Sequence, residues 1–312
     1  MIDDMQKQTR DFSWLRLILL GVAVYVSGVA MLAFLQRSLI YFPARASTIR
    51  PADSGLSEDR VSAVQVTSDD GLTLHGWQVS PTPLAPSSIQ DASPGGAIEG
   101  PAIVYFPGNA GHRGFRGDEL RTLADLGAEV FLFDYRGYGD NAGRPTEANL
   151  NRDARSVWRY LVEARGIDPS QIILFGESLG GGVAVRLAAD VGRDGSPPGG
   201  VILRSSFSSL VDVAAHHYPW APVRLLLLDR FESQQHMPDV TSPILMIHGS
   251  RDSIVPIRFA RKLFEAAPVQ SADGHPKRFA ELEGADHNDI PYVSPREYRD
   301  AMAHFLDAVL GD

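Results

Sequence analysis

Short apolar runs alternate with helical patterns along most of this chain, and this alternation limits the fold more than any other feature. The runs that predict strands cover residues 61–67, 72–79, 102–106, 130–134, 171–175, 201–204, 244–248 and 278–282. The helical patterns cover residues 114–126, 146–165, 179–190, 256–267 and 295–310. Apolar strands separated by helices predict an α/β fold with a mostly parallel, eight-stranded sheet and helices on both faces. The first two runs flank a Ser-Asp-Asp-Gly turn and predict an antiparallel hairpin at one edge.

The composition excludes several classes of protein. The 38 acidic residues outnumber the 29 basic ones, and the formal net charge of −9 argues against a nucleic-acid partner, which would favour a basic face. The absence of cysteine excludes disulfides, thiolate metal sites and a cysteine nucleophile. Residues 80–100 are rich in Pro, Ser and Gly and predict a solvated loop.

Residues 17–35 form an apolar run without a single charged side chain. As a helix, these about 19 residues would extend about 28 Å, close to the thickness of a bilayer's hydrocarbon core. Trp14 and Arg16 precede the run, and Arg37 and Tyr41 follow it, as suits the two membrane interfaces. The run therefore predicts a single-pass membrane anchor.

We accordingly expect two parts: an N-terminal segment, residues 1–36, which holds the anchor, and one folded domain, residues 37–312. A signal peptide cleaved after Ala30 is the alternative. The basic residues on the two sides of the run are nearly balanced. They favour only slightly a cytoplasmic N-terminus, with the folded domain on the extracytoplasmic side of the cell membrane.

The pentapeptide Gly176-Glu177-Ser178-Leu179-Gly180 carries the strongest chemical signal. It follows an apolar run and precedes a helix of small residues, which is the context of a nucleophile elbow. A serine on so tight a turn projects its hydroxyl from the sheet, and glycines flank it because a Cβ there would strike neighbouring backbone. A phosphate-binding loop is excluded, since no Lys-Ser or Lys-Thr follows the glycines.

A nucleophilic serine needs a base, and the base needs an acid that orients it. Asp252 follows the run 244–248, and His287 follows the run 278–282. Because the carboxyl ends of parallel strands meet at one edge of a sheet, we expect both side chains to reach Ser178 there. Asp212 is the competing candidate for the acid. His275, His248 and His304 compete for the base, and His248 is expected to be structural.

Backbone amides stabilise the charged oxygen that forms when a serine attacks a carbonyl group. The amide of Leu179 lies at the start of the helix after Ser178, where the helix dipole favours such an oxygen. We expect the second amide from the glycine-rich loop after residues 102–106, because glycines let backbone approach a substrate closely. Asn109 is expected to supply it, with Ala110 as the alternative. The glycine spacing does not match that of a dinucleotide-binding loop.

Taken together, the motifs resemble those of the α/β-hydrolase superfamily. They are similar above all to membrane-anchored serine hydrolases related to serine aminopeptidases, lysophospholipases and protein depalmitoylases. The resemblance covers about residues 35–310 and rests on the segments 38–43, 105–111, 134–139, 176–182, 248–252, 255–256 and 287–289. It implies the α/β-hydrolase fold, with the serine, aspartate and histidine named above as a catalytic triad. One departure is Pro107, where many relatives have histidine.

Residues 209–238 lie between the predicted strands 201–204 and 244–248, where this fold commonly carries a lid insert. The insert contains Tyr-Pro-Trp at 218–220 and four consecutive leucines at 225–228. These leucines either line an acyl pocket, touch the bilayer or pack as an ordinary helix against the sheet.

The expected function is hydrolysis of a carboxylic ester or thioester through an acyl-enzyme, with no cofactor and no metal. The expected partners are a small-molecule or lipid-like acyl substrate and the membrane bilayer. Three alternatives stay open: a serine aminopeptidase-like peptidase, a haloperoxidase-like side activity, and a catalytically silent binding protein tethered to the membrane. The sequence leaves the natural substrate and the oligomeric state open.

Overall fold

The computed structural model describes residues 2–81 and 100–311, with side chains from residue 14 onward. Most of the stretch 80–100, which we predicted as a loop, lies outside the described residues.

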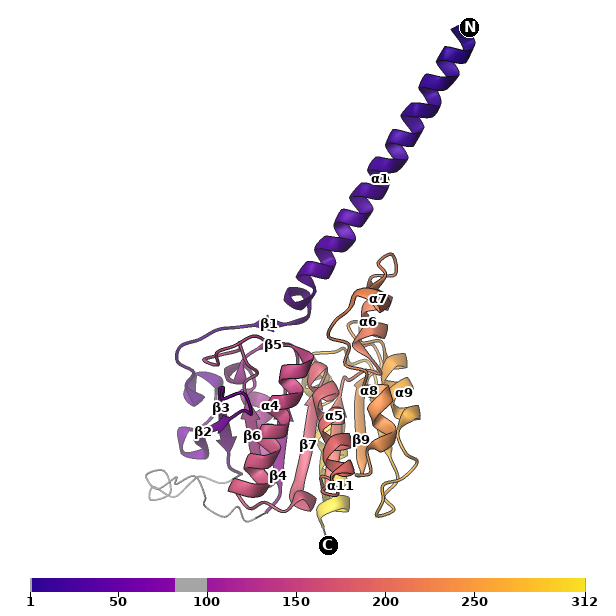
Figure 1. Cartoon of the computed structure of the whole chain (residues 1–312). Helices are drawn as coiled ribbons and strands as arrows, with labels where there is room; N and C mark the ends of the chain where they lie inside the picture. Colours follow the sequence, from indigo (N-terminus) through magenta and orange to yellow (C-terminus); the bar gives the residue numbers. More distant parts are fainter. Residues whose placement is uncertain (1, 82–99, 312) are drawn as a thin grey trace.

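The main sheet has eight strands in the order β10-β9-β8-β7-β4-β6-β3-β2 (Figure 1). Strand β3 runs antiparallel to its neighbours β2 and β6, and the other neighbouring pairs are parallel. The predicted mostly parallel sheet with a hairpin at one edge is therefore confirmed. The strands are β2 Val61–Thr67, β3 Thr73–Val79, β4 Ala102–Phe106, β6 Glu129–Phe133, β7 Ile172–Glu177, β8 Gly200–Arg204, β9 Ile244–Gly249 and β10 Arg278–Leu282.

Helices cover both faces of the sheet, as predicted (Figure 1). Helices α4, α5 and α9 pack on one face, and α3 and α11 pack on the other. The helices are α3 Gly117–Ala124, α4 Glu147–Arg159, α5 Leu179–Arg193, α6 Leu210–His217, α7 Val223–Leu226, α8 Ser233–His236, α9 Ile257–Ala266, α10 Ile290–Val293 and α11 Pro295–Leu310. A π-helical turn, Tyr160–Ala164, continues α4. Single 3-10 turns cover Pro51–Ser54, Glu58–Arg60, Arg113–Phe115, Pro169–Gln171 and Met237–Asp239.

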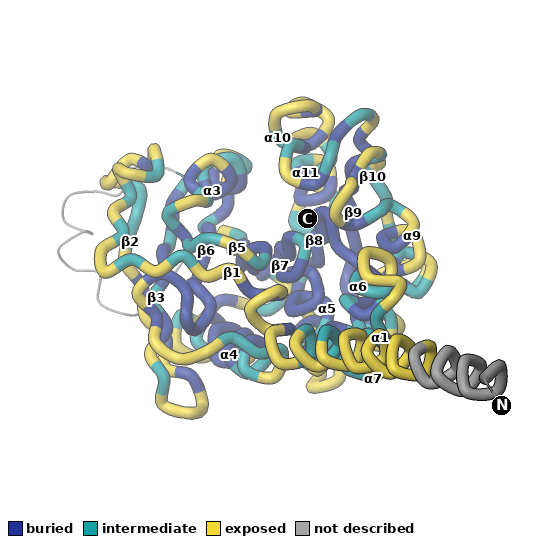
Figure 2. Tube along the Cα trace, turned by 90° about the horizontal axis from the view of Figure 1, so that it is seen from above, coloured by how far each residue is buried: buried dark blue, intermediate teal, exposed yellow. Residues whose placement is uncertain are grey.

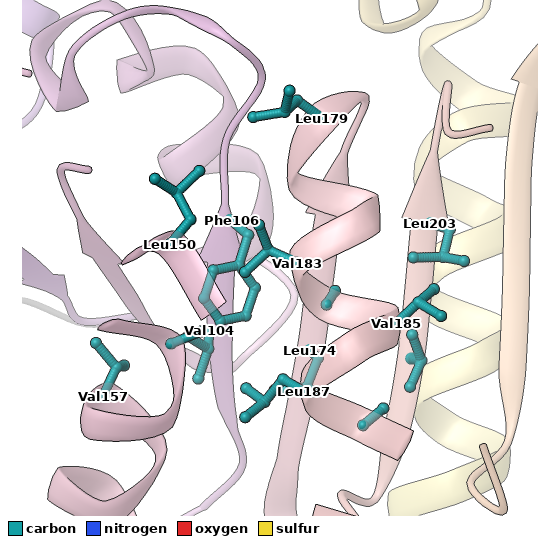
Figure 3. Close-up of a cluster of buried hydrophobic side chains, with 14 of the residues drawn as sticks. Val104, Phe106, Leu150, Val157, Leu174, Leu179, Val183, Val185, Leu187 and Leu203 are labelled. Atoms are coloured by element: carbon teal, nitrogen blue, oxygen red, sulfur yellow. The ribbon is translucent and has the colours of Figure 1, made fainter. Parts of the chain in front are cut away.

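The central strands are buried on both faces, which explains why their sequences are uninterrupted apolar runs. Alternate residues of β4 belong to different halves of the core: Val104 and Phe106 face α4 and α5, whereas Tyr105 packs on the opposite side. Figure 3 shows Phe106 between Leu150 of α4 and Val183 of α5, with Val104 below it. This packing fixes the carboxyl ends of β4 and β7 beside each other.

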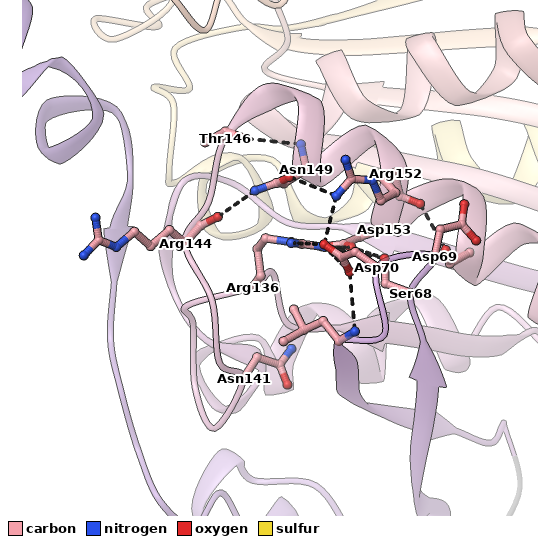
Figure 4. Close-up of polar contacts among 12 residues, drawn as sticks. Ser68, Asp69, Asp70, Arg136, Asn141, Arg144, Thr146, Asn149, Arg152 and Asp153 are labelled. Carbon is pink, nitrogen blue, oxygen red and sulfur yellow. Dashed lines mark hydrogen bonds and ion pairs between the residues drawn. The ribbon is translucent and has the colours of Figure 1, made fainter.

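A partly buried ionic cluster fastens the edge hairpin to the rest of the domain (Figure 4). Arg136, on the loop after β6, donates a 2.8 Å hydrogen bond from Nε to Asp153 of α4 and a 2.8 Å bond to Asp70. Ser68 at the hairpin turn donates a 2.7 Å bond to the same Asp153. Since Arg136 and Asp153 are both buried, each needs the other to compensate its charge.

Helix α1, Ile2–Ile40, projects from the end of the domain at which the carboxyl ends of the parallel strands lie (Figure 1). Its part Trp14–Ile40 is 27 residues long and apolar enough to cross a membrane. The helix continues past the boundary expected at residue 36. Strand β1, Phe42–Pro43, then pairs in parallel with β5, Ala110–Gly111, in the loop after β4. The base of this apolar helix is thus joined directly to the glycine-rich loop.

Candidate active site

Ser178 occupies a strained turn between β7 and α5. Its backbone has φ 51° and ψ −115°, a left-handed conformation that costs energy for a residue with a Cβ. A Cβ on Gly180 would lie 2.0 Å from the carbonyl oxygen of Phe106, and one on Gly176 would lie 2.6 Å from the Cα of Gly181. Both flanking glycines are therefore needed for the close approach of β4, β7 and α5. The hydroxyl of Ser178 stands at the carboxyl edge of the sheet.

The structure brings together the three side chains that we predicted to act as a unit. The Oγ of Ser178 lies 3.0 Å from Nε2 of His287. The Nδ1 of the same imidazole lies 2.8 Å from Oδ2 of Asp252. In this arrangement, Nε2 can take the proton of the hydroxyl while the carboxylate fixes the orientation of the ring.

A carboxylate that we did not single out joins the loops of Asp252 and His287. The Oδ1 of Asp286 accepts a 2.7 Å bond from the backbone amide of Ser253 and another of 2.7 Å from that of His287. The backbone amide of Asp286 in turn donates a 2.6 Å bond to Asp289. These bonds fix the separation of acid and base. A loop Asp looks solvated in sequence, so only its place beside His287 could have indicated this role.

Asp252 is buried and yet ionised. Burial alone would raise its pKa, but hydrogen bonds from His248 and His287 outweigh burial and hold the pKa at about 2. Its Oδ1 also accepts bonds from the backbone amides of Ile254 and Val255, at 3.0 and 2.6 Å. The carboxylate therefore stays charged at neutral pH.

Of the competing candidates, His248 lies beside Asp252 and the other three make contacts away from the elbow. Asp212 pairs with Lys262 at 2.7 Å and with Arg224 at 3.0 Å. His248 lies 2.8 Å from the carbonyl oxygen of Val255 and 3.2 Å from Asp252, so it supports the acid from the other side. His275 lies 3.7 Å from Asp273, before β10. His304, on α11, borders a surface depression at the edge of β10.

The glycine-rich loop lies against the elbow. A Cβ on Gly108 would come within 3.8 Å of the Cβ of Ser178. The carbonyl oxygen of Asn109 accepts bonds from the backbone amide of Phe42 and from the hydroxyl of Tyr138, and the side-chain amide of Asn109 donates to Ile40. The loop is therefore held from both sides. A backbone amide that is to donate a hydrogen bond to an oxyanion must be fixed in position in this way.

Glu177, beside Ser178, belongs to a buried charged network. Burial opposes its ionisation, but Arg204 and Arg116 outweigh burial and hold its pKa at about 2. The guanidinium of Arg204 lies 3.0 Å from Glu177 and also pairs with Glu119 of α3. The hydroxyl of Tyr105 donates a further hydrogen bond to Glu177. The network ties the elbow to β4, β8 and α3.

An apolar cavity of about 720 Å³ opens beside Ser178 and His287, a size within the usual range for a small-molecule site. Its walls come from α1, the glycine-rich loop, α6 and α7. The apolar lining includes Val29, Leu32, Ala33, Leu39, Phe207, Leu210, Val213, Ala221, Val223, Leu226, Leu227 and Val255. Among the side chains described (14–81 and 100–311), no group of three His, Cys, Asp or Glu residues is placed to hold a metal ion.

The similar proteins include a lipase and several proteins that are named as uncharacterized. A family model described as alpha/beta hydrolase fold matches residues 101–233. The uncharacterized protein Rv2307c of Mycobacterium tuberculosis is 42% identical over 293 residues, which are 93% of this chain and 95% of the relative. The lysophosphatidylserine lipase ABHD12 of Danio rerio is 29% identical over 95% of this chain and 79% of its own length.

Solved structures show the same fold. The Pyrococcus furiosus esterase Pf2001 superimposes with a TM-score of 0.64 over 87% of this chain and 99% of the esterase, at 18% identity. The predicted fold and the resemblance that we inferred from the motifs are thereby confirmed. The chain belongs to the α/β-hydrolase family.

Proposed function

We propose that this hydrolase is a membrane-anchored serine esterase that cleaves the carboxylic ester or thioester bond of an acyl lipid through an acyl-enzyme. The observation that carries the proposal is the line of hydrogen-bonded atoms from Ser178 through His287 to Asp252, of which Ser178 and His287 line an apolar cavity. The proposal assigns residues 37–312 to the hydrolase domain and residues 209–238 to its lid.

In the first half of the reaction, Oγ of Ser178 attacks the acyl carbonyl carbon while Nε2 of His287 takes the hydroxyl proton. Asp252 stabilises the imidazolium that results. The backbone amides of Leu179 and Asn109 stabilise the oxyanion of the tetrahedral intermediate. The intermediate collapses, and His287 gives its proton to the departing alcohol or thiol. The acyl group stays bound to Ser178.

In the second half, a water molecule attacks the acyl carbon and gives its proton to Nε2 of His287. A second tetrahedral intermediate forms and collapses, and the proton returns to Oγ of Ser178. The carboxylic acid is released and the enzyme is regenerated. The steps need only Ser178, His287, Asp252, the two backbone amides and water, so the proposed reaction uses no cofactor.

The lining of the cavity supports an acyl substrate. Each buried methylene group contributes about 0.8 kcal/mol, so an apolar cavity favours a hydrocarbon chain over a charged group. The relative from Danio rerio is named a lipase, which agrees with this preference. A thioester and an oxygen ester present the same acyl carbon to Ser178, and both remain within the proposal.

The aminopeptidase alternative needs a carboxylate that can receive a substrate ammonium group. Glu177 lines the cavity, but Arg204 and Tyr105 already engage its carboxylate. Asp134 is 2% exposed and accepts bonds from Arg113, away from the cavity lining. Neither carboxylate is free for the task, so the geometry favours an uncharged acyl group.

The test is labelling by a fluorophosphonate together with hydrolysis of p-nitrophenyl butyrate. Ser178→Ala should abolish both, because no other group at the elbow can form the covalent bond. His287→Ala should lower turnover on the order of 10⁴-fold. His275→Ala is the matched control, since its ring lies before β10, and it should retain wild-type turnover. Normal labelling of Ser178→Ala, or equal losses in the two histidine variants, contradicts the proposal.

A further inference from the structure

Helix α1 forms one wall of the cavity beside Ser178. The six residues that it contributes recur at helical spacing and therefore share one face: Val29, Leu32, Ala33, Gln36, Leu39 and Ile40. Most of them are partly or fully buried, whereas Ala30, Met31 and Phe34 on the other faces are exposed. Figure 2 shows this alternation along the part of α1 nearest the domain.

Three polar contacts fasten this face of α1 to the 209–238 insert. The hydroxyl of Tyr25 donates a 3.0 Å bond to the carbonyl oxygen of Trp220. Gln36, buried at the cavity wall, accepts a 2.7 Å bond from the backbone amide of Leu228. Arg37 forms a 3.0 Å ion pair with Asp229. The insert therefore follows α1 from its base up to Tyr25.

The insert presents apolar side chains on two sides. Leu226 and Leu227 line the cavity. Trp220 is 54% exposed and Leu225 is 86% exposed, and Tyr218 and Leu228 are exposed with them. The one charged residue in 218–228 is Arg224, which pairs with Asp212. The leucine run thus lines the cavity with one side and leaves the other uncovered.

The position of Tyr25 shows where that uncovered surface lies. The hydrocarbon core of a bilayer takes up about 20 helical residues, fewer than the 27 of the span Trp14–Ile40. Any stretch of about 20 residues inside this span includes residues 21–33. Tyr25, Val29 and Ala33 therefore lie at hydrocarbon depth for every placement of the core within the span. Trp220, bonded to Tyr25, lies there with them.

We propose that the space between α1 and the 209–238 insert is an acyl-chain site that opens to the bilayer. A membrane lipid moves sideways from the hydrocarbon core, with its acyl chain along Val29, Leu32 and Ala33. Its acyl carbonyl carbon thereby reaches the hydroxyl of Ser178 without crossing water. This inference deepens the proposed function, on which its hydrolytic step rests. It makes α1 an element that determines specificity as well as an anchor.

The first experiment compares two variants with the same substitution on different faces of α1. Ala33 lines the cavity, and Ala30 is exposed one turn earlier. In full-length protein in vesicles, Ala33→Trp should lower the ratio of dodecanoyl to butanoyl ester hydrolysis about tenfold or more, because the indole takes the place of several methylenes. Ala30→Trp should keep the wild-type ratio. Leu32→Ala, which enlarges the cavity, should shift the preference toward longer chains.

The second experiment detects the acyl chain without any hydrolysis. A fatty acid with a diazirine at its end, irradiated in vesicles with Ser178→Ala protein, should label Phe207 and Leu210. Both residues line the cavity, and Phe207 is only 2% exposed, so lipid outside the cavity cannot reach it. Adding Ala33→Trp should reduce this labelling at least about fivefold, and adding Ala30→Trp should leave it unchanged.

The outcomes separate the two proposals. Labelling of Phe207 in a protein whose wild type hydrolyses no ester would refute the proposed reaction and leave the acyl site in place. Normal hydrolysis of the butanoyl ester, with a wild-type chain-length ratio and wild-type labelling in Ala33→Trp, would overturn the acyl site and leave the esterase in place. Equal effects of Ala33→Trp and Ala30→Trp would also overturn the acyl site.

Discussion

At the scale of single residues, Asp252 combines full burial with a negative charge. Removing a carboxylate from water costs several kcal/mol unless hydrogen bonds compensate it. Two histidines and two backbone amides supply those bonds. The same bonds that orient His287 therefore also stabilise the folded chain, and this double role makes the acid testable through stability alone.

The pKa of Asp252 falls from its ordinary value of 3.8 to about 2 in the folded protein. A carboxyl with a lowered folded-state pKa contributes stability above its unfolded pKa, and that contribution disappears as pH falls from about 4 to about 2. The difference corresponds to about 2 kcal/mol. Asp252→Asn should therefore lower the melting temperature at pH 7 and flatten its decrease between pH 5 and pH 2, measured by thermal unfolding in detergent.

The control for this measurement is Asp53→Asn, because Asp53 pairs with Arg50 on the surface with both side chains mostly exposed. Its melting curve should follow that of the wild type at every pH. Parallel acid profiles for Asp252→Asn and the wild type would mean that the carboxylate is not the group that titrates there.

The sequence indicates the position of some site residues in the fold but not that of others. Ser178, Asp252 and His287 each follow a predicted strand, and parallel strands end at one edge, so their meeting could be predicted. Asp286 and Glu177 could not be assigned in the same way. Both act through contacts with segments distant in sequence: Asp286 with Ser253, and Glu177 with Arg204. The place of Asp286 beside His287 is the one local signal.

At the scale of elements, the elbow depends on how closely α5 approaches β4. A Cβ on Gly180 would lie 2.0 Å from a backbone oxygen, whereas one on Gly192 of the same helix would meet nothing closer than 3.5 Å. Gly180→Ala should therefore abolish fluorophosphonate labelling and lower the melting temperature. Gly192→Ala should label normally and gain up to about 1 kcal/mol from helix propensity. Normal labelling of Gly180→Ala would show that the turn tolerates a wider spacing.

A second element-scale prediction concerns the tie between α1 and the insert. Asp229 is 4% exposed, and it accepts bonds from Arg37 and from the backbone amide of Glu147. Asp229→Ala leaves that amide unpaired, at a cost of about 1–3 kcal/mol, and should expose residues 209–238 to limited proteolysis. Asp239→Ala removes a half-exposed pair with Arg193 and should be cut at the wild-type rate. Equal cutting of both variants would mean that the ion pair does not hold the insert.

The strands of the main sheet and the helices α3, α4, α5, α9 and α11 could be predicted because burial on one or two faces leaves a pattern in the sequence. The short helices α6, α7, α8 and α10 were not predicted. The protein-facing side of α1 could not be predicted. Lipid and protein interior are both apolar, so Val29, Leu32 and Ala33 look the same as the residues that face hydrocarbon. Gln36 is the one signal, since a buried amide at the end of an apolar helix needs polar partners, and the insert supplies them.

At the scale of the whole molecule, helix α1, the insert and the candidate site share one end of the domain. Helix α1 leaves from the carboxyl edge of the sheet, and α6 and α7 rise beside it (Figure 1). The opposite end carries the amino ends of the parallel strands and lies away from α1. This polarity directs the proposed acyl site toward the bilayer and leaves the rest of the domain to water.

The polarity leads to a prediction about the rate law. A lipid ester that reaches Ser178 through the bilayer is presented at its surface mole fraction, so tethered enzyme and substrate meet within one membrane. At a fixed bulk concentration of a dodecanoyl lipid ester, dilution with inert lipid in the same vesicles should lower the rate in proportion to the mole fraction. Hydrolysis of soluble p-nitrophenyl acetate, which enters from water, is the control and should not respond to the added lipid. A rate for the lipid ester that follows bulk concentration alone, unchanged by dilution within the vesicle, would show that the chain reaches the cavity from solution.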